Sequence, residues 1–159
     1  MAYLSLFVIA LLALFTHAKT LSDSSCGSHL DKLDTCSATI SFSGECYSSK
    51  IDLKDTEYAK CTTNAFFWSY PVNNMTLVIE TKFTQQRQPY SINLDNTQLK
   101  GAILHVYRIF NNQETEITTQ DKVLVQQSDS NYQVILKFQA PTQLSRYGVQ
   151  IDYKSTSLF

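Results

Sequence analysis

Residues 132–139 read YQVILKFQ and residues 147–154 read YGVQIDYK, and these two stretches decide the fold class. Apolar residues occupy every second position of both, and Ile135 is the one exception on the polar side. A side-chain period of two is produced by a β-strand that buries one face and exposes the other. Two such runs, joined by a loop that contains Pro141, predict a pair of half-buried antiparallel strands.

The same period recurs upstream, in residues 36–43 and 75–84. Residues 101–110 (GAILHVYRIF) are apolar on both parities, which predicts a central strand covered on two sides. Turn residues separate further, weaker strand predictions at 46–53, 65–70, 89–94 and 121–127, and short helical turns fit only near 28–34 and 54–60.

Roughly seven to nine strands in about 120 residues predict an all-β fold, a single antiparallel β-sandwich that is immunoglobulin-like or jelly-roll-like. Tyr147 begins the last strand, with Pro141 and Thr142 upstream. This placement resembles the tyrosine corner of immunoglobulin-like and fibronectin-like sandwiches. The resemblance implies an immunoglobulin-like arrangement at this end of the domain.

The N-terminus carries an export signal. Residues 4–15 read LSLFVIALLALF, which is too short for a membrane span of about twenty residues and typical of a signal peptide. Small residues follow, so we expect cleavage after Ala18: residues 1–18 are the signal peptide and 19–159 a single secreted β-sandwich domain. No later stretch reaches membrane length, which predicts an extracellular protein with no membrane span in the mature chain.

The four cysteines, Cys26, Cys36, Cys46 and Cys61, all precede residue 62. An even number behind a signal peptide predicts two disulfides, and three connectivities are possible. No CxxC pair is present, so a zinc site or redox motif is not expected. We expect the bonds to staple a polar N-terminal region. Asn74-Met75-Thr76 forms a glycosylation sequon, and we expect Asn74 to carry a glycan.

Composition excludes two broad classes of protein. A formal net charge of −1 provides no basic excess to neutralise phosphates, which excludes an electrostatic nucleic-acid binder. With 43% hydrophobic and 12% aromatic residues the chain can build a core, which excludes wholesale disorder.

The histidines of the mature chain give no catalytic or metal-binding pattern. His105 lies within the predicted central strand, where a packed or edge histidine is the simplest interpretation. His29 lies near Asp31 and Asp34 in a polar segment, and we interpret this group as surface polarity rather than a metal site.

The paired carboxylates Glu114 and Glu116 lie on one face of a turn or strand edge. A local pair does not span a cleft as glycosidase carboxylates do, and charges on an edge discourage strand-to-strand aggregation. We therefore expect no enzyme activity, no cofactor and no metal.

The segment from Phe66 to Pro71 (FFWSYP) holds the only tryptophan and has two interpretations. In the first, Phe66, Trp68 and Tyr70 fill the core while Phe67 covers a sheet face. In the second, Phe67, Trp68 and Tyr70 form an exposed platform that stacks on sugar rings or anchors a partner protein.

These features predict a secreted, non-enzymatic recognition module that binds a glycan or an extracellular protein. Two alternatives remain open. One is a structural or assembly protein of an extracellular coat or matrix, held together by edge strands. The other is a small secreted effector or venom-type protein that inhibits a target.

Overall fold

The structure is a computed structural model that describes residues 26–43 and 46–159. The predicted signal peptide, residues 1–18, lies outside the described residues. The strands are β1 (Ser28–Asp34), β2 (Ser37–Phe42), β3 (Ser48–Asp52), β4 (Thr63–Ser69), β5 (Asn74–Ile79), β6 (Tyr90–Asp95), β7 (His105–Phe110), β8 (Gln113–Glu116), β9 (Val123–Gln127), β10 (Val134–Gln139) and β11 (Gly148–Ser157). A 3-10 turn, η1 (Glu57–Lys60), precedes β4, and a short helix, α2 (Lys82–Gln85), follows β5.

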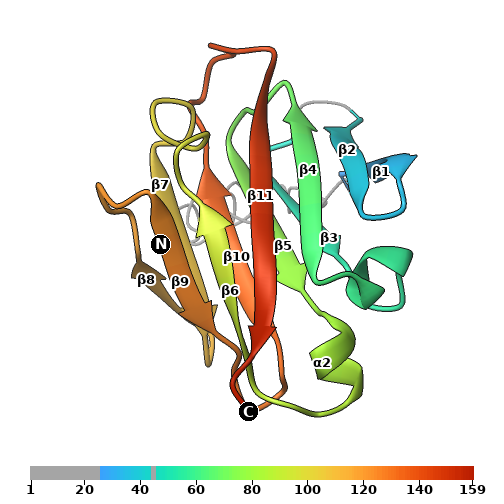
Figure 1. The fold of residues 1–159 in the computed structure, drawn as a ribbon. Coiled ribbons are helices and arrows are strands. Elements are labelled where there is room, and N and C mark those ends of the chain that lie inside the picture. The colour runs from blue at the N-terminus through green and yellow to red at the C-terminus, as the bar shows by residue number, and fades with distance from the viewer. Residues whose placement is uncertain (1–25, 44–45) are drawn as a thin grey trace, which may run out of the picture.

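The strands form two sheets that pack face to face, which confirms the β-sandwich. One has the order β1-β2-β4-β11-β6-β9 and the other β3-β5-β10-β7-β8. Figure 1 shows β11 at the middle of the front sheet, with β5 and β10 behind it. The core between the sheets contains the fully buried side chains of Phe66, Trp68, Tyr90, Phe138 and Tyr153.

The prediction of wholly antiparallel sheets is wrong for two strand pairs. β2 pairs parallel with β4, and β3 pairs parallel with β5. The reason is the path of the chain. It passes from β2 in one sheet to β3 in the other, returns through η1, and repeats the passage from β4 to β5. Both passages lead from the first sheet to the second, so β4 lies parallel to β2 and β5 lies parallel to β3.

Several expected boundaries also change. Residues 28–34 form strand β1 rather than a helical turn, while the turn expected near 54–60 is confirmed as η1. The strand predicted over 75–84 ends at Ile79, because the Thr81 side chain accepts a hydrogen bond from the Phe83 amide (3.2 Å) and begins α2. Residues that share a period of two can thus belong to two elements when a capping threonine divides them.

Residues 101–110 do not form a central strand. β7 begins only at His105 and lies second from the edge of its sheet. Arg108 points inward, 8% exposed, and donates four hydrogen bonds of 2.8–3.3 Å to backbone carbonyls of Ile109, Ile135, Gln127 and Gln133. Burial lowers the pKa of its guanidinium. Within residues 26–43 and 46–159, carbonyl dipoles rather than an ion pair stabilise this buried arginine.

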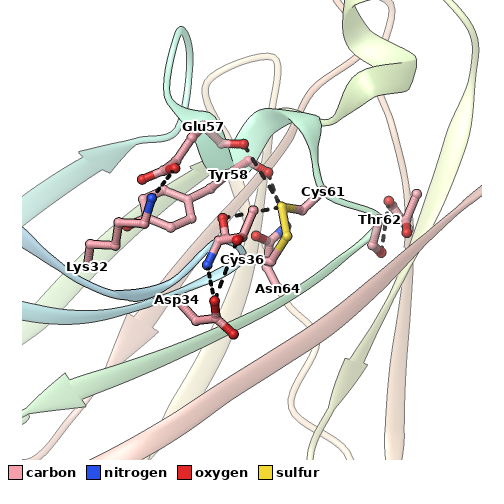
Figure 2. The surroundings of a disulfide bond; sticks show 10 residues. Lys32, Asp34, Cys36, Glu57, Tyr58, Cys61, Thr62 and Asn64 are labelled. Atoms are coloured by element: carbon pink, nitrogen blue, oxygen red, sulfur yellow. Dashed lines mark hydrogen bonds and ion pairs between the residues drawn. A yellow bond between two sulfur atoms is a disulfide. The ribbon is translucent and has the colours of Figure 1, made fainter.

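Two disulfides, Cys26–Cys46 and Cys36–Cys61, confirm the predicted staple of the N-terminal region. Cys36 lies in the turn between β1 and β2, and Cys61 directly follows η1. Figure 2 shows the second bond beside an ion pair between Lys32 Nζ and Glu57 Oε2 (2.6 Å), which links β1 to η1. The disulfide and the ion pair together attach the edge hairpin to the body of the sandwich.

No helix within residues 26–43 and 46–159 is long and apolar enough to cross a membrane.

Candidate functional site

The aromatic segment of β4 divides between core and surface, so each sequence interpretation holds only in part. Trp68 is fully buried and contacts Phe42 edge-on, with ring centroids 6.2 Å apart. This corrects the platform hypothesis at Trp68, because β4 turns that side chain toward the opposite sheet. The core hypothesis is wrong for Tyr70, which is 57% exposed. β4 ends at Ser69, and Tyr70 has a positive φ of 50°, so the strand's alternation stops before it.

Phe67 lies on the outer face of its sheet and is half-buried. Its ring covers Gly148 on the neighbouring strand. A Cβ added to Gly148 would lie 2.5 Å from Phe67 Cε1 and 2.6 Å from Cε2. Only glycine permits this approach, so the structure gives Phe67 a packing role. Its predicted role in ligand binding stays a prediction.

A cleft lies beside this segment, at the end of the sandwich where β4 ends and β11 begins, the upper end in Figure 1. Its volume is about 630 Å³, within the range typical of ligand sites. Nine of the described residues, from four separate stretches of chain, line it: Ser41, Phe42, Cys46, Tyr47, Ser69, Tyr70, Val72, Asn73 and Thr142.

Tyrosine rings form the exposed edge of this cleft. Tyr47 is 81% exposed and Tyr70 is 57% exposed. Tyr147 lies beside Tyr70, 83% exposed, with its ring edge-on to the Tyr70 ring at 6.3 Å between centroids. The Tyr70 amide donates to the Tyr147 carbonyl (2.9 Å), which fixes the two residues relative to each other. Tyr147 is therefore a surface ring, and the buried tyrosine corner implied by its position in the sequence is wrong.

The polar lining of the cleft is hydroxyl and amide chemistry. Ser69 Oγ donates to the Ile40 carbonyl (3.0 Å), and Asn73 Nδ2 donates to the Cys46 carbonyl (2.8 Å). The hydroxyls of Ser41 and Thr142 make no hydrogen bond to other described residues. None of the described lining residues carries a charge. The cleft therefore offers donors, acceptors and ring faces to a neutral ligand.

The wall that carries Tyr47 is held from two sides. Cys46 is bonded to Cys26, and its carbonyl accepts the Asn73 amide. The Tyr47 carbonyl accepts two donors from Asn74, the backbone N–H and Nδ2, both at 3.3 Å. The backbone beneath the exposed Tyr47 ring is thus fixed in place.

Asn74, the sequon residue, is the first residue of β5 and is half-buried. Its Oδ1 is buried and makes no hydrogen bond within the described residues. Nδ2, the atom to which a glycan is attached, lies in an exposed hydrogen bond close to Tyr47 and the cleft.

The titratable residues considered above lie elsewhere. His105 Nδ1 contacts Glu116 Oε1 (2.6 Å), and this hydrogen bond lowers the pKa of the Glu116 carboxyl. Glu114 pairs with Lys137 (2.8 Å), and both glutamates lie on the exposed edge strand β8, as expected. His29 is exposed on β1. Across the described part of the chain, no three metal-ligating side chains gather into a group.

No family model matches this chain, and no curated protein is similar to it. The geometry of the cleft therefore carries the functional argument. Sequence reasoning identified Tyr70 but missed Tyr47 and assigned Tyr147 to another role. No local signal could have united them, because Tyr47 and Tyr147 are separated by most of the domain.

Proposed function

We propose that this protein is a secreted, non-enzymatic recognition module that binds an extracellular glycan in the cleft between Tyr47 and Tyr70. One observation carries the proposal: a cleft of about 630 Å³, whose described lining carries no charge, combines exposed aromatic rings with hydroxyl and amide groups. A sugar presents apolar C–H faces and neutral hydroxyls, and this lining complements both. The two disulfides are compatible with an oxidising, extracellular location.

The order of the lining supports the proposal. Backbone hydrogen bonds fix the main chain of Tyr47, just before β3, and of Tyr70, just after β4, so little backbone freedom is lost when a ligand binds. Tyr70 is held at a positive φ of 50°, a conformation that costs free energy in a non-glycine residue. Such strain is often found where function requires a particular side-chain direction.

The test is a glycan array probed with the protein secreted from eukaryotic cells, followed by calorimetric titration of the sugars that bind. Tyr70→Ala and Tyr47→Ala should each weaken binding about tenfold or more, as expected for loss of an aromatic anchor. Phe110→Ala is the matched control. Phe110 is also an exposed ring, 48% exposed, but it lies at the far end of β7 from the cleft. A silent array, or equal affinity in the Tyr70 and Phe110 variants, would refute glycan binding at this cleft.

We further propose that Asn74 carries an N-linked glycan beside the cleft. The amide keeps one N–H after glycosylation, which suffices for the bond to the Tyr47 carbonyl. Endoglycosidase treatment of the secreted protein should lower its mass, and Thr76→Ala should abolish that change. Thr76→Ser keeps the sequon and serves as the control. A fully secreted protein whose mass does not respond to the enzyme would exclude the modification.

A further inference from the structure

The four edge strands of the sandwich differ in how they are protected against pairing with another strand. An edge exposes unpaired backbone N–H and C=O groups, and charged side chains or bulges normally block it. Three edges are protected in this way: β8 by Glu114 and Glu116, β3 by Lys50 and Asp52, and β1 by charged residues and a register irregularity between Lys32 and Asp34. β9, which reads VLVQQ, carries no charge.

The hydrogen-bond pattern shows which backbone groups of β9 face away from the sheet. β9 pairs antiparallel with β6. At one end of the pair the Asn96 N–H donates to the Lys122 carbonyl, and at the other end the Ser128 N–H donates to the Tyr90 carbonyl, both at 2.8 Å. Hydrogen-bonded pairs alternate along such a ladder, so Leu124 and Gln126 turn their backbone toward β6. Val123, Val125 and Gln127, the other parity, turn theirs outward, and the Gln127 carbonyl there already accepts a hydrogen bond from Arg108 Nη2 (3.3 Å).

The exposed side chains follow the same alternation. Val123 is 46% exposed and Val125 is 57% exposed, whereas Leu124 between them is buried in the core. β9 therefore presents both an open hydrogen-bonding edge and two solvent-exposed valines on one face. Within the described part of the chain, no strand pairs with β9 on this side of Val123 and Val125.

We propose that β9 pairs with β9 of a second copy of this chain, antiparallel about a two-fold axis that places Val125 opposite Val125. This register is self-complementary. The outward-facing Val125 N–H and C=O of each copy bond those of the other, and Val123 lies opposite Gln127. The pairing joins two six-stranded sheets into one continuous sheet and packs the two Val125 side chains together.

This assembly goes beyond the proposed glycan binding and does not depend on it. β9 contributes no residue to the cleft lined by Tyr47 and Tyr70. In the dimer two clefts would act together, so a multivalent glycan would be held more tightly than a single sugar.

Site-directed cross-linking tests the register. A hydrogen-bonded antiparallel pair separates opposing Cα atoms by about 5.5 Å, which suits a disulfide. Val125→Cys should therefore give a disulfide-linked dimer on non-reducing electrophoresis. Val123→Cys is the matched control: the two Val123 positions lie four residues out of register, roughly 13 Å apart. Equal cross-linking at the two positions would overturn the register.

The mass of the protein in solution tests the pairing itself. We expect light scattering to give twice the monomer mass at high concentration. Val125→Pro removes an outward N–H without touching the bonds to β6, so this variant should stay monomeric. Val125→Thr keeps the N–H and should dimerise like the unmodified protein. A protein that is monomeric at every concentration, or a proline variant that still dimerises, would overturn the proposal.

Discussion

The contact between Gly148 and Phe67 predicts that Gly148→Ala changes the stability of the protein in opposite directions with and without the Phe67 ring. Gly148→Ala places a methyl group within the Phe67 ring, 2.5–2.6 Å from Cε1 and Cε2. Overpacking of this kind typically costs about 1–3 kcal/mol of the free energy of unfolding. In a Phe67→Ala background the ring is gone, and alanine is more favourable than glycine in a strand by about 0.5–1 kcal/mol.

Gly148→Ala should therefore destabilise the unmodified protein and stabilise the Phe67→Ala variant. The expected coupling free energy between the two positions is the difference between these effects, about 1.5–4 kcal/mol. Urea unfolding of the four proteins in the cycle, followed by the emission of Trp68, measures it. Trp68 is suited to this assay because it is fully buried in the folded state and becomes exposed only on unfolding.

Two results would refute the reasoning. If Gly148→Ala changes stability equally in both backgrounds, the ring does not lie on Gly148. If Gly148→Ala is neutral in the unmodified protein, the sheet yields at this point without cost. A confirmed coupling would leave Phe67 as a packing residue and direct the search for a ligand toward the tyrosines of the cleft.

Three further predictions follow from the core. Trp68, fully buried, should emit at short wavelength and resist acrylamide quenching, and a red-shifted, easily quenched signal would contradict its placement. Burial raises the pKa of Tyr90 to about 12, so the tyrosine of the unfolded chain ionises at lower pH than that of the folded protein. The contribution of Tyr90 to stability is therefore complete below pH 10, and about 2–3 kcal/mol of it should be lost as the pH rises toward 12. Tyr90→Phe should flatten this loss in urea titrations. Arg108→Met should lower the free energy of unfolding by about 3 kcal/mol, since four carbonyls lose their donor. The control, Arg146→Met at an exposed position, should change it by less than about 0.5 kcal/mol. Equal effects of the two substitutions would refute the role of Arg108.

Much of the fold could be read from local pattern. The period of two located most of the strands, including β10 and β11, since alternation reflects the geometry of a single strand. The prediction failed where a local event interrupted the pattern, as at Thr81, whose side chain begins α2. It failed again at residues 28–34, a polar strand without alternation, which pairs with β2 and is pinned by a disulfide.

The candidate site was only partly visible in the sequence. The aromatic run of β4 pointed to the right end of the molecule, but not to the residues that face solvent. Trp68 is buried and Tyr70 exposed because β4 ends between them, at Ser69, and Tyr70 has a positive φ of 50°.

Residue type and local spacing alone predict an all-β chain, four cysteines suited to two disulfides and an uncharged aromatic segment. Tertiary structure alone sets the disulfide pairing and the two parallel strand pairs. It also brings Tyr47 and Tyr70 to one cleft and places Tyr147 against Tyr70. The physical reason is that these features depend on contacts between distant segments. Packing of the whole core fixes which strands lie side by side. Local alternation carries no information on this strand order.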